Sequence, residues 1–355
     1  MLEISAMTLT MTIPFYEQSF KEIGAVLNRE GLHPSGASLL YNWHYKKKQF
    51  DPCTTDLARK TQEFVREYYS FDLPRIVHVH ESVDRTVKFL FELHDGRRVE
   101  SVLIPFIGKY SLCVSTQVGC AMKCAFCFTG TQGLTRNLTT TEIVGQYLGA
   151  WSWLRTNRPD EVKIPNVVFM GQGEPLHNFD AVKKACEIFI TEEGLGLGTR
   201  RITVSTAGYL PGLERWIAEM PRVNIALSLH STSDEKRNRL IPINQRYPLK
   251  DIIEVLDRIP MQKKQFVTYE YLLIDEYNDF EEDAHAVGEL LKSRRALLNL
   301  IPFNPFPGSE FKRARRERVE AFKAITDTYR VPTMIRTTKG DDILAACGQL
   351  NTKIQ

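Results

Sequence analysis

Strand-like and helix-like segments alternate along the chain from about residue 110 onward, and this alternation limits the possible folds more than any other feature. Apolar runs predict strands at residues 112–116, 166–170, 201–205, 223–229, 266–274, 297–302 and 333–336. Amphipathic patterns predict helices between them, at residues 140–154, 181–191, 211–220, 249–259, 279–292 and 315–329. The order predicts an α/β fold, a parallel sheet covered by helices. These units are too few for an eight-unit barrel, so an open sheet and a partial barrel remain alternatives.

The first hundred residues have a different pattern. Helical patterns at residues 20–32, 36–48 and 55–69 precede strand-like runs at residues 75–80, 86–93 and 98–104. Asp95-Gly96 between the last two runs is typical of a tight hairpin turn. We expect a small N-terminal helical and β-hairpin domain over residues 1–105, a second domain over residues 106–355, and a hinge at residues 105–109.

Composition argues against a membrane protein and against a secreted, disulfide-rich protein. The 355 residues are 43% hydrophobic and 25% charged, as in ordinary globular proteins. No apolar run reaches the roughly 18 residues of a membrane span, and the N-terminus lacks the pattern of a secretory signal. We therefore expect a cytoplasmic protein without a membrane partner. An odd number of cysteines, 7, argues against a secreted disulfide framework. The net charge of +3 neither requires nor excludes nucleic acid.

Three of the cysteines form a CxxxCxxC motif: Cys120, Cys124 and Cys127, just after the first predicted parallel strand. Three thiolates on one short loop can bind one metal centre, whereas structural zinc normally takes four ligands. A 4Fe-4S cluster on three cysteines keeps one iron open for a substrate or cofactor. The alternative is a zinc site completed by a distant histidine.

This motif after the first strand of a βα series resembles the signature of radical S-adenosylmethionine enzymes. The resemblance implies a partial (βα)6-type radical SAM barrel, a 4Fe-4S cluster on the three cysteines, and S-adenosyl-L-methionine on the open iron. Gly173 and Glu174, in the turn after the strand at residues 166–170, resemble the motif that binds the methionine amine.

Polar residues at strand ends are further candidates for binding the cofactor, because ligands bind at the carboxyl ends of parallel strands. These candidates follow three different strands. They are Ser205, then Ser228, Leu229 and His230, and finally Asn304.

Longer sequence motifs resemble those of one particular family within the radical S-adenosylmethionine enzymes. LCVSTQVGC, GQGEPLHNFD, RRITVSTAG, NLIPFNPFPG and KGDDILAACGQL together resemble the ribosomal RNA (adenine-2)-methyltransferases that also modify transfer RNA. The match runs from about residue 30 to the C-terminus. It implies methylation of carbon 2 of an adenosine in 23S rRNA, and in tRNA, with two S-adenosylmethionine molecules per turnover. It also implies a flavodoxin-type or other electron donor. Gln172 replaces the methionine expected between the two glycines of its motif.

The resemblance assigns reactive roles to three more residues. Cys347 is methylated first, and a radical from the second S-adenosylmethionine then removes hydrogen from its S-methyl group. Carbon 2 of adenine cannot attack a sulfonium methyl, whereas a thiolate can, so methylating a cysteine first makes the transfer feasible. Glu100 accepts the ring proton, and Cys113 releases the product by forming a transient disulfide with Cys347.

Basic residues are the candidates for binding RNA. They are Lys46 to Lys48 with Trp43 and Tyr45, then Arg200 and Arg201, then Arg237, Arg239 and Arg246, and the run at residues 312–318. Two alternatives stay open: a related enzyme that methylates carbon 8 of the adenine, and a zinc-containing RNA-binding protein without catalysis. Cys53 and Cys186 are expected to be structural.

Overall fold

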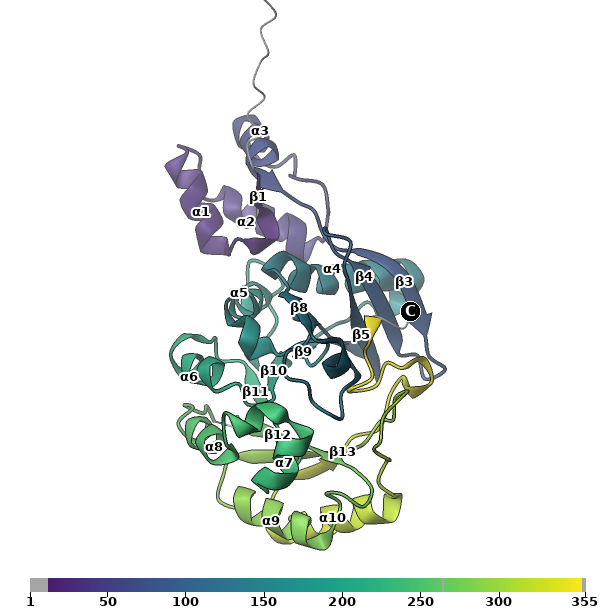
Figure 1. Ribbon diagram of the computed structural model, residues 1–355. Helices are drawn as coiled ribbons and strands as arrows, with labels where there is room; N and C mark the ends of the chain where they lie inside the picture. Colours follow the sequence, from purple (N-terminus) through teal and green to yellow (C-terminus); the bar gives the residue numbers. More distant parts are fainter. Residues whose placement is uncertain (1–11, 264, 353–355) are drawn as a thin grey trace, which may run out of the picture.

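A ten-stranded mixed sheet forms the centre of the protein in the computed structural model, which describes residues 12–263 and 265–352 (Figure 1). The strand order is β14-β13-β12-β11-β10-β9-β6-β5-β4-β3, so both edges of the sheet are open and the barrel is not closed. Strands β6 and β9 to β14 pair in parallel, which confirms the predicted α/β class. Their carboxyl ends lie along one edge, where the predicted site residues lie.

The parallel strands follow the predicted order closely. Their bounds are β6 (Lys109–Cys113), β9 (Asn166–Phe169), β10 (Ile202–Thr206), β11 (Asn224–Ser228), β12 (Val267–Leu273), β13 (Ala296–Pro302) and β14 (Thr333–Ile335). The first strand ends at Cys113, three residues earlier than predicted, because the chain turns away from β5 there and hydrogen-bonds to the loop after β9.

Helices lie around the outer side of the parallel part of this sheet (Figure 1). Those that were predicted are α4 (Thr140–Asn157), α5 (Phe179–Ile190), α6 (Leu210–Glu219), α8 (Leu249–Asp257), α9 (Glu281–Leu291) and α10 (Arg316–Thr328). One short helix, α7 (Asp234–Leu240), was not predicted. Its sequence has no apolar periodicity, because one of its buried residues is Arg237.

The N-terminal helices are also close to prediction. They are α1 (Phe20–Arg29), α2 (Gly36–Tyr41) with a π-helical turn (Asn42–Lys46), and α3 (Arg59–Tyr68). Aromatic side chains hold them together: Phe15 stacks on Phe71 with ring centroids 5.0 Å apart and contacts Tyr45, whose side chain is fully buried. Burial of Tyr45 contradicts its predicted role in binding RNA.

The predicted hinge at residues 105–109 is wrong. Strands β3 (Arg75–Glu81), β4 (Val87–Glu92) and β5 (Arg98–Phe106) extend the central sheet, and β5 pairs antiparallel with β6 through Phe106 and Lys109. Gly108, with φ +67°, supplies the tight turn between them. Two paired strands joined by a tight turn give a rigid hairpin at this position, so the sheet is continuous across residue 105.

The C-terminal segment packs against strands β3 to β5 (Figure 1). Asp342 accepts a hydrogen bond from the Ser82 hydroxyl at 2.6 Å, and the backbone N–H of Asn351 donates to Glu100 at 2.7 Å. This segment carries Cys347, so these contacts bring that cysteine to the sheet. Among the described residues, no helix is long and apolar enough to span a membrane.

Candidate active site

The three motif cysteines lie on a loop framed by two short strands, β7 (Gln117–Gly119) and β8 (Leu134–Asn137), which pair antiparallel. Cys120, Cys124 and Cys127 all line one pocket at the carboxyl ends of the parallel strands, here called the cluster pocket. Met122 and Phe126 line it as well and make it apolar. Burial raises the pKa of the Cys120 thiol to about 12, so a bound metal is needed to deprotonate it at neutral pH.

The donor set fits a 4Fe-4S cluster. In the part of the chain that the structure describes, no three His, Cys, Asp or Glu side chains are arranged to hold a single metal ion. In a cluster each cysteine binds a different iron atom, so three thiols spread around one pocket suit it. The apolar side chains of the lining also limit access of water to the metal centre.

The turn after β9 supplies the next part of the cluster pocket. Glu174 is almost fully buried there and accepts hydrogen bonds from the backbone N–H groups of Ala207 at 2.8 Å and Leu176 at 3.1 Å. Burial raises the pKa of Glu174 to about 7. A buried carboxylate facing a pocket is suited to accept a hydrogen bond from an ammonium group, which would favour its charged form.

Close packing within the protein explains the glycine of this turn. At Gly173, which has φ +103°, an added Cβ would lie 2.6 Å from the Cβ of Gln117. The glycine therefore lets the turn pack against the chain that leads into the cysteine loop. Gly173 also lines the cluster pocket, next to Glu174.

Most of the predicted strand-end residues meet at the cluster pocket. Ser205, Ser228 and His230 line it. His230 has a φ of +55°, accepts a hydrogen bond from the Leu272 backbone N–H at 3.0 Å, and packs its ring edge-on against Phe126. Burial lowers the pKa of His230 to about 3, so its ring is neutral.

Two of the predicted strand-end residues do not line the cluster pocket. Leu229 is fully buried, and its backbone carbonyl accepts a hydrogen bond from Arg237 at 3.1 Å. Asn304 instead donates to the backbone carbonyl of Cys347 at 3.2 Å and lines a second cavity. Its side chain therefore positions the segment that carries the tail cysteine.

Sequence reasoning missed Glu270, which also lines the cluster pocket. It lies on β12, is almost fully buried, and burial raises the pKa of its carboxyl. The hydroxyl of Ser205 donates to it at 3.5 Å. A charged residue within the apolar run of a buried strand was the signal that could have revealed it.

Cys113 and Cys347 line the second cavity, here called the cysteine-pair cavity. Cys113 is the last residue of β6 and is buried, whereas Cys347 is exposed on the C-terminal segment. All cysteines are free thiols, so the expected disulfide is not formed in this structure. Cys347 lines the cluster pocket as well, so it stands where the two cavities meet.

Glu100 lies on β5 beneath the C-terminal segment and lines neither cavity. Its carboxylate forms an ion pair with Lys88 at 3.0 Å and accepts the Asn351 hydrogen bond. The backbone N–H of Glu100 donates to the Gln172 side chain at 2.9 Å, and its carbonyl accepts from the Ser115 hydroxyl at 2.5 Å. The pairing of β5 with β6 does not reach Glu100, so Gln172 and Ser115 make the backbone hydrogen bonds that β6 makes further along β5.

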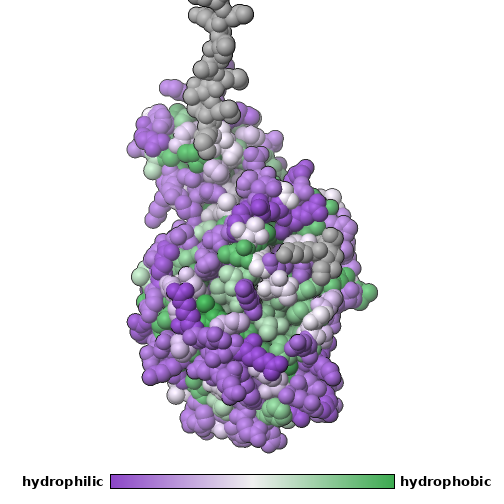
Figure 2. All heavy atoms as spheres, in the orientation of Figure 1, coloured by the Kyte–Doolittle hydropathy of each residue, from purple (hydrophilic) through white to green (hydrophobic). Residues whose placement is uncertain are grey.

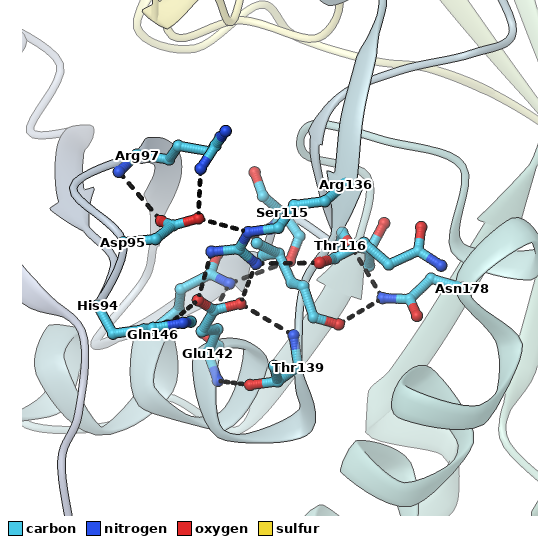
Figure 3. A network of polar contacts seen from close by, with 12 residues as sticks. His94, Asp95, Arg97, Ser115, Thr116, Arg136, Thr139, Glu142, Gln146 and Asn178 are labelled. Carbon is cyan, nitrogen blue, oxygen red and sulfur yellow. Dashed lines mark hydrogen bonds and ion pairs between the residues drawn. The ribbon is translucent and has the colours of Figure 1, made fainter.

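A buried polar network fixes the chain between Cys113 and the cysteine loop (Figure 3). Gln146 on α4 accepts a hydrogen bond from the Ser115 N–H at 2.8 Å and donates to its carbonyl at 3.0 Å. Asn178 donates to the carbonyl of Thr116 at 2.9 Å. Arg136 on β8 pairs with Glu142 through two nitrogens at 2.8 Å, in a fork geometry. These bonds hold the segment between the two cavities rigidly.

The predicted basic residues are distributed unevenly. Lys46, Lys47, Arg200, Arg201, Arg239 and Arg246 are exposed, as expected. Arg237 is fully buried, which contradicts its predicted contact with RNA. The run at residues 312–318 is largely neutralised by ion pairs, namely Arg313 with Asp341, Arg315 with Asp275, Arg316 with Glu320 and Arg318 with Asp279. That run offers less free positive charge than its sequence suggests.

Comparison with known proteins identifies the family. A sequence profile described as Radical SAM superfamily matches residues 114–287, which include the cysteine loop and the turn at Glu174. The chain is 43% identical to a dual-specificity RNA methyltransferase RlmN from Pelobacter propionicus over 97% of this chain and 95% of that protein. The chain belongs to the dual-specificity RNA methyltransferase RlmN family. The RlmN protein of Phenylobacterium zucineum is 41% identical over 89% of this chain and 83% of that protein.

A solved structure of a radical SAM methyltransferase has the same fold. The crystal structure of a radical SAM methyltransferase from Sphaerobacter thermophilus matches with a TM-score of 0.86 at 36% identity, over 96% of this chain and 99% of that chain. The protein is thus a radical SAM methyltransferase that uses a 4Fe-4S cluster and S-adenosylmethionine. When bound, these two groups supply a carbon radical that can remove hydrogen from an unactivated C–H bond.

Proposed function

We propose that this protein methylates carbon 2 of an adenosine in 23S rRNA, and in tRNA, through a methylated Cys347. One observation carries the proposal: Cys347 lines both the cluster pocket and the cysteine-pair cavity. A methyl carrier must meet the cofactor on one side and the nucleobase and resolving thiol on the other. The names of the 41–43% identical relatives support an RNA substrate.

The two cysteines have different roles in this proposal, and their positions support both. Burial raises the pKa of the Cys347 thiol, so its thiolate becomes more abundant as the pH rises. The thiolate takes a methyl group from S-adenosylmethionine, and the sulfur later carries that carbon to the adenine ring. Attack by Cys113 on the Cys347 sulfur forms an S–S bond and breaks the C–S bond. The electron pair of the broken bond stays with the carbon, which takes a proton and becomes the methyl group. The unpaired electron that the radical addition leaves on the ring passes to the external electron-transfer partner, so the product has a closed shell. An external reductant then restores both thiols.

We assign removal of the ring proton to Glu100. Its carboxylate is held by Lys88 and by the Asn351 N–H, so a shift of the C-terminal segment is needed to open it to the base. The same segment carries Cys347, and one movement can therefore serve both residues. The electron that starts each radical step comes from an external donor, and a flavodoxin-type protein suits this role.

The N-terminal residues up to 105 act in this proposal as an accessory part that binds RNA, and residues 106–355 carry the chemistry. Lys48 lies over the Trp151 ring at 4.7 Å and Arg155 over the same ring at 5.1 Å, while Lys47 lies over Trp43 at 5.5 Å. Cations interleaved with aromatic rings can bind phosphates and stack bases. Hydrophobic residues gather near the middle of the face in Figure 2 with hydrophilic residues around them, as expected for a base pocket within a polar RNA surface.

Mass spectrometry of the modified nucleoside tests the proposal. Anaerobically reconstituted enzyme, S-adenosylmethionine, a one-electron reductant and 23S rRNA fragments or tRNA should give 2-methyladenosine. A product that coelutes with 8-methyladenosine would assign the carbon-8 reaction instead, and an unmodified RNA would contradict an RNA substrate. Retention of label from S-adenosylmethionine in the nucleoside confirms the source of the carbon.

Glu174 is proposed to bind the ammonium group of S-adenosylmethionine. Glu174→Gln keeps the shape of the side chain but removes the charge, so affinity for S-adenosylmethionine should fall about 10- to 100-fold, the loss of one charge-assisted hydrogen bond. Calorimetry on the cluster-loaded enzyme measures it. Glu270→Gln, in the same pocket, is the matched control and should have the smaller effect. A larger loss in Glu270→Gln would move the assignment to Glu270.

A further inference from the structure

Arg237 is a buried cation whose side chain the proposed chemistry does not use. Its guanidinium donates to the backbone carbonyls of Ala207 at 2.8 Å, Ser228 at 3.0 Å and Leu229 at 3.1 Å, and to the side-chain oxygen of Asn244. These partners come from the loop after β10, the end of β11 and the turn after α7. All of them lie at the carboxyl edge of the sheet, behind the cluster pocket.

The hydrogen bonds of Arg237 satisfy its donors without neutralising its charge. Within residues 12–263 and 265–352, no carboxylate forms an ion pair or hydrogen bond with it. Asp234, one helical turn away, favours the charged form of Arg237 from a distance, but it accepts its hydrogen bond from Asn244 at 2.7 Å and not from the guanidinium. Burial lowers the pKa of Arg237 to about 10, so the side chain is still charged at neutral pH. An unpaired buried cation is costly unless a nearby anion compensates for it.

Arg237 lies behind one wall of the cluster pocket: Ala207 and Ser228, whose carbonyls accept its hydrogen bonds, line that pocket together with the three motif cysteines. The backbone N–H of Ala125, between two motif cysteines, donates at 2.9 Å to the carbonyl of Leu240 at the end of α7. Leu240 also packs in the same apolar cluster as Cys120 and Cys124. A 4Fe-4S cluster with three thiolates is anionic, and one-electron reduction makes it more so.

We propose that Arg237 is a positioning residue for the redox centre, whose unpaired buried charge stabilises the anionic cluster on the motif cysteines and raises its reduction potential. Cluster charge and its surroundings are known determinants of such potentials. The surroundings have a low dielectric constant, so the charge acts strongly over a short distance. The inference goes beyond the proposed function and does not depend on the RNA substrate.

A potentiometric titration followed by electron paramagnetic resonance tests this role. Reconstituted Arg237→Gln, which keeps hydrogen-bonding groups and loses the charge, is titrated with dithionite and mediators without RNA. Each reduction transfers one electron from dithionite to the cluster. The midpoint potential should become more negative by at least about 59 mV, a tenfold change in the ratio of reduced to oxidised cluster. An unchanged midpoint potential overturns the proposal.

Two further variants distinguish an effect of the Arg237 charge on the midpoint potential from an effect of side-chain packing. Arg237→Lys keeps the charge, and Asn244→Ala removes one neutral partner of Arg237, so both should keep a potential near that of the unmodified enzyme. A shift in either as large as in Arg237→Gln would show that packing sets the potential and would overturn the proposal. If Arg237→Gln does not retain iron, retention by Arg237→Lys and Asn244→Ala supports the charge role. Loss of iron from all three variants contradicts it.

Discussion

Cys347→Ala should abolish RNA methylation, with a loss on the order of 10³-fold or more, and leave the fold intact. Cys347 lines two cavities, so removal of its sulfur enlarges existing space and leaves no new void, and the stability should change by less than about 0.5 kcal/mol. Carbon 2 of adenine cannot take the methyl group by a polar reaction, so a thiol must carry it. Among the described cysteines, only Cys347 and the cluster ligand Cys127 line both cavities. Transfer of labelled methyl groups to RNA measures the effect.

Two readouts make the result specific to the methyl-carrier role. The Cys347→Ala enzyme should retain iron and sulfide and should still cleave S-adenosylmethionine, since the cluster ligands and Glu174 are unchanged. Cys53→Ala, at a buried cysteine outside both cavities, is the matched control and should remain active. Normal product formation by Cys347→Ala would refute the role, and loss of the cluster would show a structural effect instead.

The order of strands and helices could be predicted because each element has the periodicity of its class. Strand β9 is a short run of aliphatic and aromatic residues after Asn166. Helix α4 begins with a capping box, in which Thr139 and Glu142 bond to each other's backbone N–H groups. Helix α7 could not be predicted this way, because its interior face is formed by Arg237 and Leu240. A charged residue that faces inward leaves no apolar pattern to read.

The candidate site was predictable to a similar extent. The cysteine loop and the turn at Glu174 are local motifs, and the structure places them on one pocket. Glu270 and the buried state of Arg237 depend on which side of an element faces the pocket, and the spacing of neighbouring residues does not reveal this. The hairpin at residues 105–109 was misread as a hinge, because a proline and a glycine close together occur in both kinds of turn.

Cys113→Ala should trap a covalent link between the protein and its RNA. Without the second thiol, the bond between the Cys347 sulfur and the transferred carbon has no nucleophile to break it, because the other cysteines lie outside the cysteine-pair cavity or bind the cluster. Burial raises the pKa of the Cys113 thiol, so the release step in the unmodified enzyme should become faster as the pH rises and the thiolate fraction grows. Denaturing gels with labelled RNA detect the link, and mass spectrometry of peptides locates it.

The double variant Cys113→Ala/Cys347→Ala tests whether the RNA is bonded to the Cys347 sulfur. It should give no adduct, whereas Cys113→Ala should accumulate up to one adduct per cluster-loaded protein and release little free product. Truncating a buried cysteine costs about 1 kcal/mol of stability, which the fold can tolerate, so iron content and thermal unfolding of both variants should stay close to those of the unmodified enzyme. Multiple turnovers by Cys113→Ala would rule out its resolving role. An adduct that survives in the double variant would place the link on a residue other than Cys347.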